Sequence, residues 1–224
     1  MLDWDPVILS LRVALAALLL VFVSATLAAR VMTRTELPGR DVLEAVFTLP
    51  LVLPPVVTGY FLLVLLGRRG PLGEFLLERL DLQILFTALA AVIAAAVVSF
   101  PLMYQSAKAA FQAIDEGLED AARTLGAGEI RVFLTVTLPL AWPGLVAGTV
   151  LTFARALGEF GATIMVAGNI PGRTTTVPLA IYFLADAGDL RLAGIYALLI
   201  SVASMIMIVV LNRWTRHRTA RRRR

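Results

Sequence analysis

Cysteine, histidine and charged residues are scarce in this chain. The 224 residues include no cysteine and a single histidine, His217, so the sequence supports neither a disulfide nor a cysteine or histidine metal site, and heme, zinc and thiol chemistry are not expected. Charged residues make up 16% and hydrophobic residues 59%. A soluble globular domain has about 25% and about 45–50%, so this class of protein is excluded.

Long uncharged runs are what the chain has instead. Five of them, 13–29, 45–67, 82–107, 132–154 and 192–212, approach the roughly 20 residues that a helix needs to cross a bilayer. Two shorter runs, 160–172 and 174–185, cannot span a core about 30 Å thick at about 1.5 Å per residue. The sequence therefore predicts an all-α polytopic membrane protein.

A single transmembrane domain over 1–224 is expected to contain all of these runs. The expected spans are 8–30, 42–66, 83–106, 140–166 and 191–212, with a cytoplasmic loop at 114–137. We expect 174–185 to lie at the outer surface or to re-enter the membrane partway, buried against protein.

The basic residues predict the orientation. Most Lys and Arg fall on one side of the membrane if the acidic N-terminus is outside and the arginine-rich tail at 213–224 is inside. Because the N-terminus is acidic, the first apolar run is expected to be a retained span and not a signal peptide. A basic tail can also bind nucleic acid, but juxtamembrane arginines that contact anionic lipid are the favoured interpretation.

The loop at 114–137 has the pattern of two short helices joined by a glycine turn. Four residues fall at helical spacing on one face: Leu118, Ala121, Ala122 and Leu125. Acidic residues crowd the first turn and Gly126 is placed to end the helix. A second short helical pattern begins near Ile130, and Leu138 and Pro139 begin the entry to the next membrane helix.

This loop resembles the EAA loop of the permeases of ABC importers. The matching elements are Asp120, Ala121, Ala122, Gly126, Val136, Leu138 and Pro139, all at the family's spacing. Asp120 stands where the family usually has Glu, and Val136 where it usually has Ile. The resemblance implies a permease of the type I importer fold whose short helix docks on a separate ATPase subunit. The residues that it implies for ATPase coupling are Glu119, Asp120, Ala121, Ala122, Arg123, Gly126, Leu138 and Pro139.

Four further segments resemble the molybdate permeases of bacterial ABC importers: 49–60, 67–70, 99–103 and 154–163. The stretch 157–161 is shared with sulfate-type permeases, so an oxyanion importer is the broader implication and molybdate the narrower one. The resemblance implies two ATPase subunits on the cytoplasmic side and a periplasmic molybdate-binding protein. Sulfate, thiosulfate and tungstate stay open as alternative substrates, because these anions share a tetrahedral dianionic shape.

Helix-breaking and charged residues within the spans suggest a translocation pathway. Pro54 and Pro55 remove backbone donors inside an apolar run, and Arg155 and Glu159 place charges at membrane depth four residues apart. The full set of expected pathway or gate residues is Pro54, Pro55, Thr58, Gly59, Arg155, Gly158, Glu159, Gly161 and Thr163. The alternative interpretation is structural: the prolines shape packing, and the two charges pair with each other.

Five helices enclose too little space for a gated path, so a homodimer with the pathway on its two-fold axis is expected. The chain has no G-x-x-x-x-G-K-[ST] motif, so ATP hydrolysis is expected on a separate subunit, and no cofactor is expected. An intramembrane enzyme using Arg155, Glu159 and polar groups such as Tyr60 or Thr163 lacks a credible nucleophile and base. A proton-coupled secondary transporter remains the main alternative outside the importer class.

Overall fold

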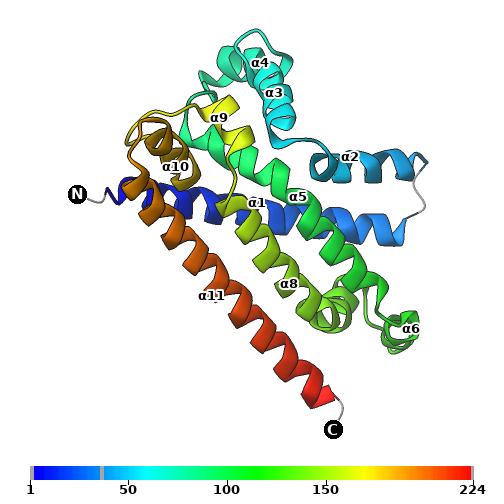
Figure 1. Ribbon diagram of the computed structural model, residues 1–224. Coiled ribbons are helices and arrows are strands. Elements are labelled where there is room, and N and C mark those ends of the chain that lie inside the picture. Colours follow the sequence, from blue (N-terminus) through cyan, green and yellow to red (C-terminus); the bar gives the residue numbers. More distant parts are fainter. Residues whose placement is uncertain (1–2, 36–37, 223–224) are drawn as a thin grey trace.

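The computed structural model describes residues 3–35 and 38–222, and these residues form helices joined by turns and loops, with no strand (Figure 1). The elements are α1 (Asp5–Arg34), α2 (Arg40–Val52), α3 (Pro55–Leu66), α4 (Pro71–Leu80), α5 (Ala88–Gln112), α6 (Glu116–Thr124), α7 (Glu129–Val132), the π-helical turn η1 (Phe133–Thr137), α8 (Leu138–Leu157), α9 (Gly161–Ala167), α10 (Val177–Asp186) and α11 (Leu190–Arg222). Arg223 and Arg224 of the basic tail lie outside the described residues.

Four helical stretches within the described residues are long and apolar enough to cross a membrane. They are Asp5–Arg34, Ala88–Gln112, Glu129–Leu157 and Leu190–Val210. A bent pair, α2 and α3, gives a fifth apolar crossing if both halves count as one span. The all-α architecture with about five spans is therefore confirmed.

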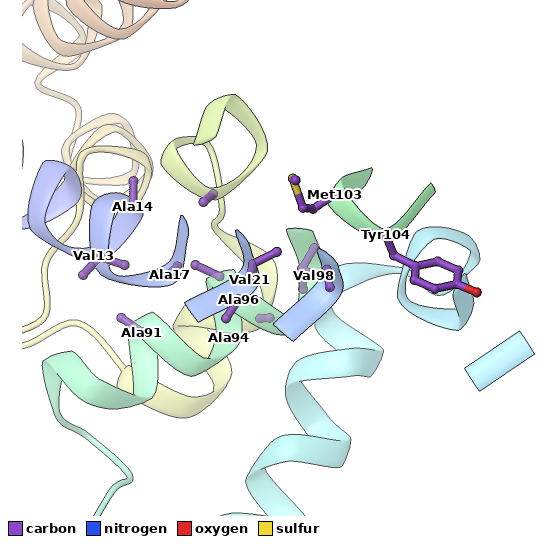
Figure 2. Close-up of a cluster of buried hydrophobic side chains, with 14 of the residues drawn as sticks. Val13, Ala14, Ala17, Val21, Ala91, Ala94, Ala96, Val98, Met103 and Tyr104 are labelled. Atoms are coloured by element: carbon purple, nitrogen blue, oxygen red, sulfur yellow. The ribbon is translucent and has the colours of Figure 1, made fainter. Parts of the chain in front are cut away.

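Small side chains bring α1 and α5 together at the centre of the molecule. The buried residues of α1 include Ala14, Ala17, Ala25 and Ala29, and those of α5 include Ala90, Ala91, Ala94 and Ala95. Figure 2 shows four of them, Ala14 and Ala17 of α1 and Ala91 and Ala94 of α5, at the contact of the two helices, where bulky residues would hold the backbones apart. Gly144 and Gly148 let α8 approach the other side of α5, because a Cβ on Gly148 would stand 2.7 Å from Ser106 Cβ.

The span expected at 42–66 is not one helix. Its two halves, α2 and α3, meet at an angle of 118°. Leu53 is extended, with φ −72° and ψ 140°, and Pro54 follows with ψ 135°. Since neither Pro54 nor Pro55 has an N–H group, the helical hydrogen bonds cannot continue across this point, and α3 begins anew with Pro55 in its first turn.

The helical stretch found in place of the span expected at 140–166 has different ends. It starts earlier, because α7, η1 and α8 form a continuous helical stretch from Glu129 to Leu157. Pro139 cannot donate to the carbonyl of Thr135, and the bond from Leu138 N to Phe133 O shifts the register to the π pattern. It ends earlier, at Leu157, before the separate helix α9.

The short helix α10, over part of the run 174–185, is too short to cross a bilayer. Its residues Val177, Leu179 and Ala180 are buried, and the helix packs on α11 and α1. Ser10 of α1 accepts a hydrogen bond from Val177 N at 2.7 Å, which fixes the start of α10. From there α11 runs the length of the bundle toward the C-terminus (Figure 1).

Candidate functional site: a coupling helix and a broken-helix contact

The predicted amphipathic helix at 115–126 is present as α6, and local signals define both of its ends. Asp115 caps the N-terminus, since its Oδ1 accepts a hydrogen bond from Gly117 N at 2.9 Å. Gly126 adopts φ +83°, a left-handed conformation that disfavours other residues. The N–H of Gly126 donates to Arg123 O at 2.9 Å and that of Ala127 to Ala122 O at 3.1 Å, which ends the helix.

The apolar face of α6 points away from the subunit. Leu118 is 50% exposed and Leu125 is 88% exposed, and Ala121 between them is also exposed. Ile130, just beyond the glycine turn, is 79% exposed. An amphipathic helix normally buries its apolar stripe against its own protein, so the orientation of α6 is the reverse of the usual one. These side chains form an apolar surface that the subunit itself leaves uncovered.

Ion pairs make α6 and α7 one unit. Arg123 Nη1 lies 2.6 Å from Asp120 Oδ1, and Arg123 Nε lies 2.6 Å from Glu129 Oε1. The hydrogen bonds to Glu129, and then to Asp120, raise the pKa of Arg123 above its usual range, so the guanidinium stays charged. Because Glu129 begins the helical stretch that continues into α8, the Arg123–Glu129 pair links α6 to a helix that is long and apolar enough to cross a membrane.

Glu119 is buried against the subunit, away from the exposed Leu118 and Leu125. Its side chain is 2% exposed and pairs with Arg30 of α1 at 3.3 Å, with Arg34 of α1, and with Arg123 at 3.5 Å. Thr137 of η1 donates a hydrogen bond to Glu119 Oε1 at 2.5 Å. The other predicted coupling residues, Leu138 and Pro139, start α8 directly after this threonine.

Sequence reasoning missed the partners of Glu119. Arg30 and Arg34 are among the basic residues that predict the orientation, and their i,i+4 spacing at the end of an apolar helix also places both on one face. The Arg30 guanidinium also lies over the rings of Phe111 and Phe133, at 5.8 and 5.4 Å from their centroids.

Two broken helices meet at the other end of α5. Gly59 of α3 lies so close to α9 that a Cβ there would stand 2.7 Å from Ala162 Cα. Gly161 at the start of α9 is also confined, though less tightly, since a Cβ there would stand 3.0 Å from Pro55 Cβ. The structure thus brings together the breaks at Pro54 and Gly158, which lie about a hundred residues apart in the sequence.

The two threonines of the predicted pathway lie within this contact region. Thr58 is 5% exposed and Thr163 is 1% exposed. The Thr58 hydroxyl has no hydrogen-bond partner among the described residues. By contrast Gly158 is not confined, because a Cβ there would meet only Ala154 O, at 3.7 Å. Among the predicted glycines, close packing therefore requires Gly59 and Gly161 but not Gly158.

Arg155 and Glu159 form an ion pair across the break between α8 and α9. Arg155 Nη1 lies 2.7 Å from Glu159 Oε2, and Ala162 N donates to Glu159 Oε1 at 2.7 Å. Glu159 is 3% exposed, and Arg155 keeps 30% of its side chain exposed. The carboxylate therefore links the end of α8 to the first turn of α9, and the structural interpretation of this pair agrees with its contacts within the subunit.

The helix α6 and the contact of α3 with α9 lie at opposite ends of α5 (Figure 1). Phe86, just before α5, donates its N–H to Val166 O of α9 at 2.8 Å, whereas α6 follows the other end of α5. A helix of 25 residues is roughly 37 Å long. The length of α5 is close to the thickness of a bilayer with its interfacial regions. The two sites therefore lie at different depths of the same helix bundle.

Similar proteins of known identity agree with this arrangement. The chain is 46% identical over 212 residues to the molybdenum transport system permease protein ModB of Escherichia coli K12, covering 95% of this chain and 93% of that protein. It is 46% identical to the putative molybdenum transport system permease protein YvgM of Bacillus subtilis, covering 96% and 94%. The sulfate transport system permease protein CysT of Salmonella typhimurium is 36% identical, covering 83% and 67%.

Solved structures share the fold at low sequence identity. A bacterial ABC transporter involved in the import of the acidic polysaccharide alginate matches with a TM-score of 0.77 at 16% identity, covering 95% of this chain and 78% of that one. The MetNI methionine ABC transporter in inward-facing conformations matches with a TM-score of 0.69 at 18% identity, covering 95% and 94%. Residues 21–224 match the family described as binding-protein-dependent transport system inner membrane component. The chain belongs to this family of transport system inner membrane components.

Proposed function

We propose that this chain is the membrane-spanning permease subunit of an ATP-driven importer that carries molybdate across the inner membrane by alternating access. The reversed orientation of α6 is the single observation that carries the ATP-driven part. Leu118, Ala121 and Leu125 face outward while the only buried residue of α6 is a carboxylate, Glu119. Such an apolar surface fits a groove on an ATPase subunit, which supplies the chemical energy.

Molybdate is the favoured substrate because the relatives of highest identity reported above are molybdenum permeases that align over nearly their whole length. Sulfate permeases are related less closely and align over less of their length, which favours molybdate over sulfate. A permease handles its anion only in transit, so recognition belongs to a periplasmic molybdate-binding protein. Tungstate has the same shape and charge, and the binding protein decides between the two anions.

The pathway is proposed to follow the contact of α3 with α9, to which Pro54, Pro55, Thr58 and Gly59 contribute from the first break. Pro55 lies against Gly161, and Gly59 lies against Ala162. The confinement of Gly59 against Ala162 supports this placement, because it brings the two helix breaks into direct contact. Gly158, Glu159, Gly161 and Thr163 contribute from the second break, with Arg155 holding Glu159 in place. ATP-driven displacement of α6 would change how α3 and α9, the helices that follow the two breaks, pack against each other.

A homodimer is part of the proposal. No residue of α2 is buried in the single chain, although Val42, Val46 and Leu49 are large apolar side chains that are 67%, 55% and 48% exposed. A second copy related by a two-fold axis, together with lipid, covers these surfaces and encloses the path. We infer that the N-terminus lies in the periplasm and the C-terminus in the cytoplasm, on the same side of the membrane as α6.

Reconstitution in proteoliposomes tests the proposal. Uptake of molybdate should require the permease, the ATPase subunit, ATP and the binding protein together. Uptake driven by a proton gradient without ATP would instead establish a secondary transporter. Binding of molybdate, tungstate and sulfate to the cognate binding protein identifies the substrate, and a preference for sulfate would overturn the molybdate assignment.

A further inference from the structure

Glu119 has an unusual position for a charged residue on a short surface helix. It is the one buried residue of α6, and its carboxylate contacts four side chains: Arg30, Arg34, Arg123 and Thr137. A buried carboxylate is stable only when it is paired, so these contacts hold α6 in one orientation. The Arg123–Glu129 ion pair also holds α6 against α7, so the exposed apolar surface does not depend on Glu119 alone.

The partners of Glu119 come from three different elements. Arg123 belongs to α6 itself, and Thr137 belongs to the π turn that precedes α8. Arg30 and Arg34 belong to the end of α1. Arg30 and Glu119 are 89 residues apart in the sequence. Since α1 packs along α5 through the centre of the bundle, Glu119 joins α6 directly to the core and not only to its neighbours in the chain.

The π turn contributes to this junction. Its altered register, with Leu138 N bonded to Phe133 O, rotates the following residues relative to a regular α-helix. Thr137 is fully buried there and directs its hydroxyl at Glu119 Oε1. A local backbone irregularity thus coincides with the point where α6 is attached to the start of α8.

We propose that Glu119 is a positioning residue for energy coupling, and that it acts inside the permease without touching the ATPase. Resting on the proposed function, this assignment gives α6 a second connection to the bundle: α7 and η1 lead to α8, and Glu119 leads to α1. A movement of α6 then displaces α1 and α8 together. Without the carboxylate, the ATPase still docks on the apolar surface, but its movement is transmitted incompletely.

The test compares Glu119→Gln with the wild type in the full reconstituted complex. We expect the variant to bind the ATPase subunit and to hydrolyse ATP, while molybdate transported per ATP hydrolysed falls about fivefold or more. Glu116→Gln is the matched control, because Glu116 is exposed on the same helix. It should leave the ratio unchanged. A residue that only stabilises the fold would lower the yield of complex without changing transport per ATP.

Three further variants, Thr137→Val, Arg30→Lys and Arg30→Gln, keep the outcome decisive. If Glu119→Gln does not assemble, Thr137→Val removes one hydrogen bond and keeps every charge, and it should also lower transport per ATP. Arg30→Lys should retain more of the ratio than Arg30→Gln, since it keeps the charge beside Glu119. An unchanged ratio in Glu119→Gln, or in Thr137→Val where the first variant fails to assemble, would overturn the inference. ATP-independent uptake by the wild type would instead overturn the proposed function.

Discussion

Gly59 of α3 and Ala162 of α9 are in backbone contact, so close that a Cβ on Gly59 would stand 2.7 Å from Ala162 Cα. The contact joins the broken span formed by α2 and α3 to the break between α8 and α9. Close-packed helices leave no space for an added methyl group at such a contact. This contact is therefore the part of the proposed pathway most sensitive to volume.

Replacing Gly59 by alanine should disrupt this contact. The added methyl group would also lie 2.8 Å from Met165 Cβ, so the two helices must move apart, at a cost of about 1–3 kcal/mol. We expect a lower melting temperature of the permease in detergent and a loss of molybdate uptake. Gly194→Ala in α11 is the control, because no atom lies within 4 Å of the corresponding Cβ. Equal behaviour of the two variants would show that the contact does not matter.

Replacing Gly126 by valine should affect the end of α6 through the backbone. The open space around Gly126 accommodates a side chain, but its φ of +83° disfavours every residue with a Cβ by about 1–2 kcal/mol. We expect α6 to lose its defined end and the ATPase subunit to bind more weakly, as measured by co-purification and by ATP-dependent uptake.

The control for this change is Gly128→Ala. Gly128 has equally open surroundings but an ordinary φ of −70°. The Gly128→Ala variant should bind the ATPase subunit as well as the wild type does. Equal binding by Gly126→Val and the wild type would contradict a role for the left-handed turn.

Local signals account for what the sequence could predict. The helix α6 was predictable because Asp115, the spacing of its apolar residues and Gly126 all lie within one short segment. The break at Pro54 and Pro55 was predictable from the missing N–H groups, but its angle of 118° was not, because the direction of α3 depends on its packing against α9.

Contacts between distant segments were beyond sequence reasoning. The pairing of Glu119 with Arg30 joins residues 89 positions apart, and no periodic pattern links them. The π turn was equally hidden, because Pro139 indicates only that an ordinary helical bond is missing and not how the backbone compensates. The pair of Arg155 with Glu159 was foreseen as an alternative because both residues lie on one helix face, whereas the hydrogen bond from Ala162 N depends on the break that follows.

Removing Arg155 should leave the Glu159 carboxylate buried without its partner. We expect Arg155→Gln to destabilise the permease by roughly 2 kcal/mol, less than the cost for a fully buried pair because Arg155 is 30% exposed. The double variant Arg155→Gln with Glu159→Gln should recover stability, since the neutral amide oxygen still accepts from Ala162 N. Thermal unfolding in detergent measures both, and a double variant as unstable as the single one would contradict this account.

Replacing Leu125 by glutamate should separate docking from folding. Leu125 is 88% exposed, so a charged side chain at this position contacts water in the isolated permease and should leave its melting temperature within about 2 °C of the wild type. In the complex the same position is expected to lie in an apolar groove of the ATPase, where an unpaired carboxylate is strongly unfavourable. Co-purification with the ATPase subunit and ATP-dependent molybdate uptake should both be lost.

Leu190→Glu is the matched control, because Leu190 is 70% exposed at the start of α11, away from α6. If Leu125→Glu bound the ATPase as well as this control does, the apolar surface of α6 would not be the docking surface.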